Sequence, residues 1–167
     1  QTSKVTGTAS VTTLRDLPFG DTAGYNGVVK SGAAATLSVA DNQLLGISGG
    51  LAFEVNHQAG KIGDGSVDIN FEGPTQRLNA TATFTLSAVE GFGVPDRVNG
   101  PVMLLPGGQF QLSIVNNALG VASLRNVNFS VKQSGEGATG RIVGAVNGSY
   151  NFQTSKLTAT GNARLAG

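Results

Sequence analysis

The side chains that could perform acid–base or nucleophilic chemistry are few in this 167-residue chain. His57 is the only histidine and cysteine is absent, so one chain cannot form a multi-histidine or thiolate metal site, a disulfide or a cysteine nucleophile. A serine triad would have to use His57, and we interpret the GISGG segment at Gly46–Gly50 as a turn or bulge within a long strand. The sequence therefore predicts no metal ligands, no cofactor and no covalent catalysis.

Carboxylates are the remaining candidates for chemistry, because two of them suffice for glycoside hydrolysis. Glu54 and Asp68 lie on the polar faces of successive predicted strands, and Glu72 follows shortly after. Such side chains are routine at solvent-facing strand positions, and no aromatic platform that could hold a sugar ring lies nearby. We therefore expect a protein that is not an enzyme.

Charge and composition restrict the class of protein further. The chain has 11 Lys and Arg against 10 Asp and Glu, a balance without the clustered basic charge of nucleic-acid binders. Charged residues make up 13%, about half the usual share, and there are 25 glycines. Threonine, serine, asparagine and glutamine fill the polar positions, as in many secreted β-proteins. No apolar run approaches the roughly 20 residues of a transmembrane segment.

Apolar and polar residues alternate along most of the chain, which indicates strands with one buried and one wet face. The clearest example is Leu78–Ala88. Short glycine-rich segments such as Glu72–Gln76 separate these runs and favour antiparallel hairpins. The pattern predicts an all-β fold of roughly nine or ten strands. The best candidate for a helical turn is Asn116–Arg125.

Two stretches repeat the same phrase. INFEGPTQRLNATATF begins at Ile69, and YNFQTSKLTATGNAR begins at Tyr150. Each copy lies at the same place in a unit of three predicted strands. These strands are Leu51–His57, Gly65–Phe71 and Leu78–Ala88 in the first unit, and Val127–Lys132, Arg141–Phe152 and Leu157–Leu165 in the second. A duplicated β-meander over 51–88 and 127–165, within a single domain 1–167, explains the repeat. Chance similarity between threonine-rich strands is the alternative.

Many inward positions of these strands are small. Examples are Ala80, Ala82, Ala159, Gly161 and Ala163. Alternating small and large interior residues are typical of small closed barrels, and closure removes exposed edges. We therefore predict an antiparallel up-and-down β-barrel of about eight strands, with up to ten, built from the two meanders. A β-sandwich is the alternative.

Two long irregular segments are candidates for binding, because loops on a rigid β scaffold often carry function. The first is Val89–Gly108 and the second is Leu14–Gly27. Their aromatic, Met, Arg and Pro residues suit an interface. The predicted partner-binding residues are Phe92, Pro95, Arg97, Met103, Leu104, Phe19 and Tyr25. The alternative for Met103–Leu105 is a plug or a further strand of the sheet.

The phrase GSVDINFEGPTQRL at Gly65–Leu78 resembles strand pairs in bacterial surface β-barrels, including the barrel modules of transferrin-binding-protein-type lipoproteins. The resemblance covers the two meanders. The chain ends in GNARLAG and lacks the closing glycine-rich, acidic signature of those modules. The resemblance implies a bacterial barrel that is extracellular, at the cell surface or periplasmic, and it assigns no individual site residue.

Three classes of function follow from these observations. The first is a non-enzymatic extracellular or cell-surface module that binds a protein or glycan partner through its long loops. The second is a structural or assembly domain of a larger envelope or secreted protein. The third is a carrier of a small apolar ligand, for which small inward residues leave room.

Overall fold

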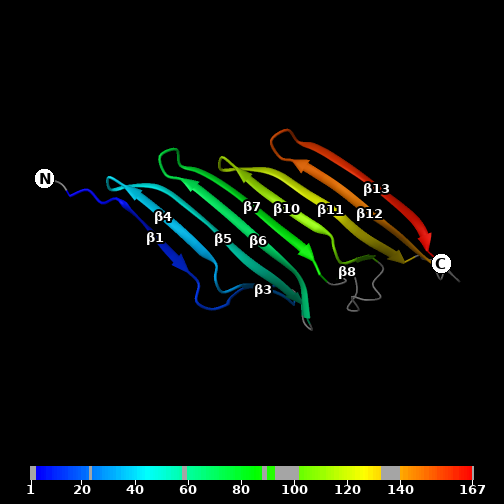
Figure 1. Cartoon of the computed structure of the whole chain (residues 1–167). Helices are drawn as coiled ribbons and strands as arrows, with labels where there is room; N and C mark the ends of the chain where they lie inside the picture. Colours follow the sequence, from blue (N-terminus) through cyan, green and yellow to red (C-terminus); the bar gives the residue numbers. More distant parts are fainter. Residues whose placement is uncertain are drawn as a thin grey trace.

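The computed structural model describes residues 3–22, 24–57, 60–87, 90–92, 102–132 and 140–166. Within these ranges the chain forms thirteen strands and no helix (Figure 1), and so it contains no long apolar helix of the kind that crosses a membrane. The strands are β1 (Gly7–Thr12), β2 (Leu17–Thr22), β3 (Tyr25–Val29), β4 (Ala34–Ala40), β5 (Gln43–His57), β6 (Gly60–Glu72), β7 (Arg77–Leu86), β8 (Glu90–Phe92), β9 (Val102–Leu104), β10 (Gln109–Val115), β11 (Ala118–Lys132), β12 (Arg141–Asn151) and β13 (Lys156–Ala166).

All thirteen strands belong to one antiparallel sheet, so the predicted all-β antiparallel class is confirmed. Its main path runs β1-β4-β5-β6-β7-β10-β11-β12-β13, and the ribbons lie side by side in this order from blue to red in Figure 1. The β2–β3 hairpin joins the path through β5, and the β8–β9 pair joins it through β11. The described strands leave the sheet open, because β1 and β13 are not paired with each other.

The six strands predicted for the repeated units are all present as β5–β6–β7 and β11–β12–β13. Each unit begins with a 15-residue strand, and each ends in a hairpin with a four-residue turn. Gln76 (φ 54°) and Ser155 (φ 53°) hold the left-handed conformation at the last position of these two turns. The two halves thus use the same local design at the corner where the repeated phrase lies.

The helical turn expected at Asn116–Arg125 is absent, and a tight hairpin turn leads directly into β11 instead. Asn116 (φ 50°) and Asn117 (φ 68°) are both left-handed, as the favoured two-residue hairpin turn requires. Asparagine tolerates this conformation because its side chain can hydrogen-bond locally. Here the Asn117 amide also bonds the next hairpin: its Oδ1 accepts from the Leu78 N–H at 2.7 Å, and its Nδ2 donates to the Gln76 carbonyl at 2.9 Å.

Asn147-Gly148, usually a strong turn signal, lies inside β12 instead of in a turn. The Asn147 side chain accepts a hydrogen bond from the Asn126 N–H at 2.8 Å. Asn126 has φ 51° and sits at a bulge between Leu124 and Val127 in β11. The dipeptide therefore supports the bulge of the neighbouring strand.

Residues that lie opposite each other in the register share one face of the sheet, which separates the side chains into two sets. We call one set the apolar face. Two of its rows across the sheet are Phe53, Gly65, Phe84, Phe110, Leu124, Gly148 and Ala159, and Leu51, Val67, Ala82, Leu112, Ala122, Tyr150 and Leu157. The opposite surface, the polar face, carries for example Ser66, Thr83, Gln111, Ser123, Ser149 and Thr158.

The described residues contain little core. Their buried hydrophobic side chains are Ile62, Leu86 and Val127. Every substantial contact between strands in the described part joins hydrogen-bonded neighbours, so no second layer packs on the sheet there. An apolar sheet face normally packs against another layer, and this face lacks one within the described ranges.

Candidate binding surface

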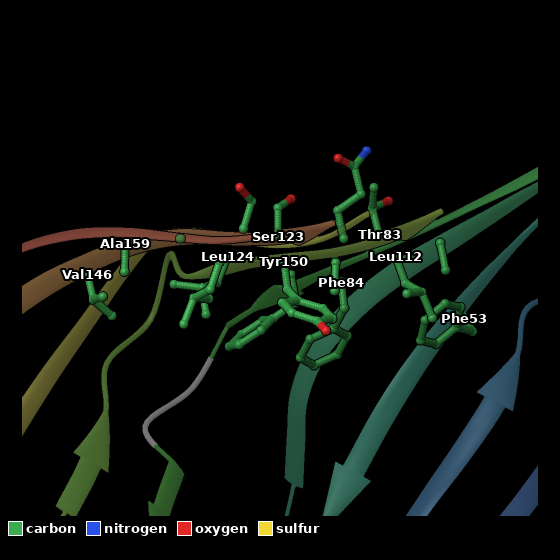
Figure 2. A pocket seen from close by; sticks show the side chains of 16 residues that line it. Phe53, Thr83, Phe84, Leu112, Ser123, Leu124, Val146, Tyr150 and Ala159 are labelled. Carbon is green, nitrogen blue, oxygen red and sulfur yellow. The ribbon is translucent and has the colours of Figure 1, made fainter. Parts of the chain in front are cut away.

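The apolar face contains a hollow of about 480 Å³ over β7, β10, β11, β12 and β13. Small residues from four strands, Ala82, Ala122, Gly148 and Ala159, leave this space open, and larger side chains surround it. In Figure 2, Phe84, Leu112, Leu124, Val146 and Tyr150 project to one side of the ribbons, whereas Thr83 and Ser123 project to the other. The volume falls within the range of about 300–1,000 Å³ that is typical of small-molecule sites.

Aromatic rings extend the apolar face beyond the hollow. The ring centroids of Phe19 and Phe53 are 6.2 Å apart, those of Phe53 and Phe84 are 6.4 Å apart, and those of Phe84 and Phe110 are 6.2 Å apart. Aromatic pairs at such distances contribute about 0.5–1.5 kcal/mol each beyond their buried area. The four rings therefore form one continuous strip across six strands, from β2 to β10.

Each of several rings lies over a glycine of a neighbouring strand. Phe53 covers Gly65, and Phe129 covers Gly144 at the corresponding place in the second unit. A Cβ atom at either glycine would collide with the ring and with a backbone carbonyl. Glycine at these positions is required by the close approach of the ring.

The apolar side chains become more exposed toward β13. Leu112 in β10 is 39% exposed, whereas Leu157 and Leu165 in β13 are 70% and 69% exposed. Leu112 has a neighbouring strand on each side and is therefore less exposed, whereas β13 has a neighbour on one side only. The edge therefore carries the largest unsatisfied hydrophobic surface of the second unit.

The candidate acid–base residues are not brought together. Glu54 lies opposite Asp64 in the register, whereas Asp68 lies opposite Gly50. Glu72 accepts a hydrogen bond from the Thr75 hydroxyl at 2.6 Å in the turn. No group of three or more metal-ligating side chains occurs among the described residues. The arrangement gives no support to the predicted Glu54–Asp68 pair, and Glu54 and Asp64 each pair with a lysine instead, Lys30 and Lys61.

His57 and Ser48 are likewise far apart. His57 packs against Tyr25, with ring centroids 4.3 Å apart and the ring planes inclined at 44°. The GISGG segment carries the letters of a nucleophile motif, but Ser48 lies within β5, nine positions before His57, and not at the strand-to-helix turn that such a motif needs. About 30 Å separates the two positions at 3.3 Å per residue.

The charged groups form short surface pairs. Lys30 Nζ lies 2.6 Å from Asp16 Oδ2 and 3.6 Å from Glu54 Oε1. The hydrogen bond from Lys30 lowers the pKa of Asp16, and the same bond raises the pKa of Lys30. Lys61 pairs with Asp64 at 2.5 Å. These pairs are exposed and structural in character.

The predicted loop residues fall into two separate groups. Phe19 and Tyr25 belong to the β2–β3 hairpin beside β5, and Met103 and Leu104 belong to β9 beside β11. The half-buried Met103 and Leu104 thus form a further strand, as the alternative interpretation expected. Strands β5, β6 and β7 separate the two groups, because β3 pairs with the outer side of β5 and β9 pairs with the same side of β11 as β10 does. This corresponds to about 20 Å at 4.8 Å per strand.

Two of the predicted loop residues, Pro95 and Arg97, lie outside the described residues. Phe92 pairs with Val102 through the backbone of β8, and its side chain is not described. The loop-borne binding set thus remains a prediction.

Sequence reasoning missed the extent of the apolar face. The alternation of apolar and polar residues could have identified this face. When the inward residues of neighbouring strands are compared across the register, they form unbroken apolar rows. No protein-family model, curated protein or solved structure matches this chain. The function is therefore inferred from the geometry of this surface.

Proposed function

We propose that this chain is a non-enzymatic assembly module whose apolar face is covered by a second copy of the same chain. The observation that carries the proposal is the continuous apolar face, which has no covering layer among the described residues. The hydroxyl-rich polar face and the low charge suit a module of an extracellular or cell-surface protein. Closure of two such sheets would complete the barrel, or alternatively the sandwich, predicted from the sequence.

The accessible area supports a macromolecular cover. The chain exposes 10661 Å², whereas a folded monomer of its mass, 16.9 kDa, exposes about 7,700 Å². The difference of about 3,000 Å² per chain corresponds to about 6,000 Å² for two chains, which is at the upper end of the total area, roughly 2,000–5,000 Å² and above, that obligate homodimers bury. A small ligand in the hollow would cover only a fraction of this area.

The hollow favours a second candidate function, a carrier of an apolar ligand such as an acyl chain. Its size and its aromatic and aliphatic lining suit such a ligand. A partner site made from the loops alone gains less support, because Phe19 and Met103 lie on hairpins separated by three strands of the main path.

Sedimentation velocity of the chain and of two variants tests the proposal. Ala122 lines the hollow on the apolar face, and its neighbour Ser123 points to the polar face. We expect a dimer for the chain and for Ser123→Asp. We expect a monomer for Ala122→Asp, because a carboxylate buried without a partner in an apolar interface costs several kcal/mol.

Binding of a hydrophobic dye and mass spectrometry of the purified protein separate the two candidates. A dimer that binds little dye supports assembly. A monomer that retains an apolar molecule, and loses it on Ala122→Asp, supports the carrier and refutes assembly. A monomer without bound molecules, unchanged by either substitution, refutes both.

A further inference from the structure

The β13 strand is an edge with little protection against pairing. It is the last strand of the main path in Figure 1, and its other side is unpaired in the described part of the chain. All eleven of its residues pair with β12 without a register shift, so it contains no bulge, and it has no proline. Natural sheets usually protect an edge by these devices, by charged side chains or by an inward charge. The only charges of β13, Lys156 and Arg164, lie near its two ends and on the polar face, which leaves its centre uncharged.

The apolar side of β13 is symmetric in sequence. Its residues are, in order, Leu157, Ala159, Gly161, Ala163 and Leu165. This order reads the same in both directions about Gly161. The other edge of the sheet lacks such symmetry, because β1 presents Gly7, Ala9 and Val11 on its apolar side.

We propose that two copies join through their β13 strands, antiparallel and centred on Gly161. This inference rests on the proposed assembly function and specifies where the two copies join. We call the contact between the two β13 strands the seam. In this register Leu157 of one copy lies opposite Leu165 of the other, and Ala159 lies opposite Ala163. A two-fold interface must be self-complementary in this way, and the two most exposed leucines of the strand gain a leucine neighbour.

The polar side of the seam is compatible with the same register. Thr158 lies opposite Arg164 of the second copy, Thr160 opposite Asn162, and Lys156 opposite Ala166. Like charges directly opposite each other would oppose pairing. No such pair occurs in this register. The nearest like charges, Lys156 and Arg164 of the second copy, are diagonal neighbours, and their long side chains can turn away from each other into solvent.

The seam also explains how the apolar faces are covered. Pairing would join two nine-strand paths into one continuous sheet with both apolar faces on the same side. Open twisted sheets rarely exceed about 10 strands without curling or dividing into two packed layers. Glycine and alanine at the centre of the seam leave room for a bend toward the apolar side.

Cysteine cross-linking tests the register, because the chain has no cysteine of its own. We would mix Ala159→Cys with Ala163→Cys, one of them carrying a short tag, under mild oxidation. Opposed residues on antiparallel strands have Cα atoms about 4.5–5.5 Å apart, which a disulfide can bridge. In either variant alone the two cysteines lie four residues apart along the seam, about 13 Å, which a disulfide cannot span.

We expect the mixture to form the tagged–untagged disulfide at least about tenfold faster than either variant forms a disulfide alone, given this geometry. A dimer in sedimentation whose mixture cross-links no faster than the single variants overturns the seam and leaves the assembly function intact. Cross-linking of Ala9→Cys with Ala163→Cys instead would indicate head-to-tail pairing of β1 with β13, and would also overturn it. A monomer in sedimentation refutes the assembly function and the seam with it.

Discussion

Replacement of Leu165 by alanine distinguishes two contributions of this side chain: to the stability of its own chain, and to the association of two chains at the β13 seam. Leu165 is 69% exposed in the single chain. Truncation of such a side chain changes the free energy of unfolding of one chain by no more than about 0.5 kcal/mol. Its effect should therefore appear in the association of two chains.

The magnitude follows from the exposed area that the seam would bury. A fully buried leucine contributes about 1.5–3 kcal/mol relative to an exposed one. About two thirds of the surface of Leu165 is available, and one cross-strand neighbour covers roughly half of that, which leaves about 0.5–1 kcal/mol per leucine. The two-fold symmetry doubles the loss to about 1–2 kcal/mol, so we expect the dimer dissociation constant to rise by about 5- to 30-fold.

Sedimentation equilibrium over a range of concentrations measures this constant, and urea unfolding of the dilute chain measures the stability of one copy. Leu14→Ala is the matched control, because Leu14 is 94% exposed in the connection between β1 and β2. The control should leave both quantities unchanged. An unaltered dissociation constant for Leu165→Ala, or a loss of several kcal/mol from the single chain, would refute the reasoning.

Two further predictions concern the sheet itself. Gly144→Ala should lower the free energy of unfolding, measured by urea titration, by about 1–3 kcal/mol, because the added methyl collides with the Phe129 ring and the Asn162 carbonyl. Gly60→Ala is the control: a methyl at Gly60 meets open space, so this variant should be neutral or slightly stabilising in the same titration. Asn117→Ala should cost about 2–3 kcal/mol, from a left-handed alanine and two lost hydrogen bonds. Asn117→Gly should recover the conformational part of that loss, and equal destabilisation by both variants would show that backbone strain at this turn contributes nothing.

The strands were predictable because their signal is local. Period-two alternation over Leu78–Ala88 and Leu157–Leu165 determines which side chains share a face, and both segments form strands with nearly these bounds. The repeated phrase also located the two four-residue turns correctly. At Asn147-Gly148 the repeat outweighed the turn signal, because Asn147 bonds the bulge of β11.

The features that were missed depend on contacts between distant segments. The sequence predicts a helical turn at Asn116–Arg125, whereas Asn116 and Asn117 adopt the left-handed conformation of a tight hairpin turn. The openness of the sheet could not be derived from periodicity, because alternation is the same in an open sheet and in a barrel. The extent of the apolar face became visible only with the register, which places Phe84, Phe110 and Leu124 opposite one another.

Because phenylalanine rings lie over glycines on the apolar face, that face tolerates fewer substitutions than the polar face. On the apolar side, a change at Gly65 or Gly144 collides with a ring, and a change at Phe53 or Phe129 exposes the bare backbone of the glycine beneath it. On the polar side, threonine, serine and asparagine can replace one another with little effect on packing. Substitutions should therefore accumulate during evolution at every second residue of the strands. Distant relatives would keep phenylalanine and glycine opposite each other on neighbouring strands, while most residues between them would differ.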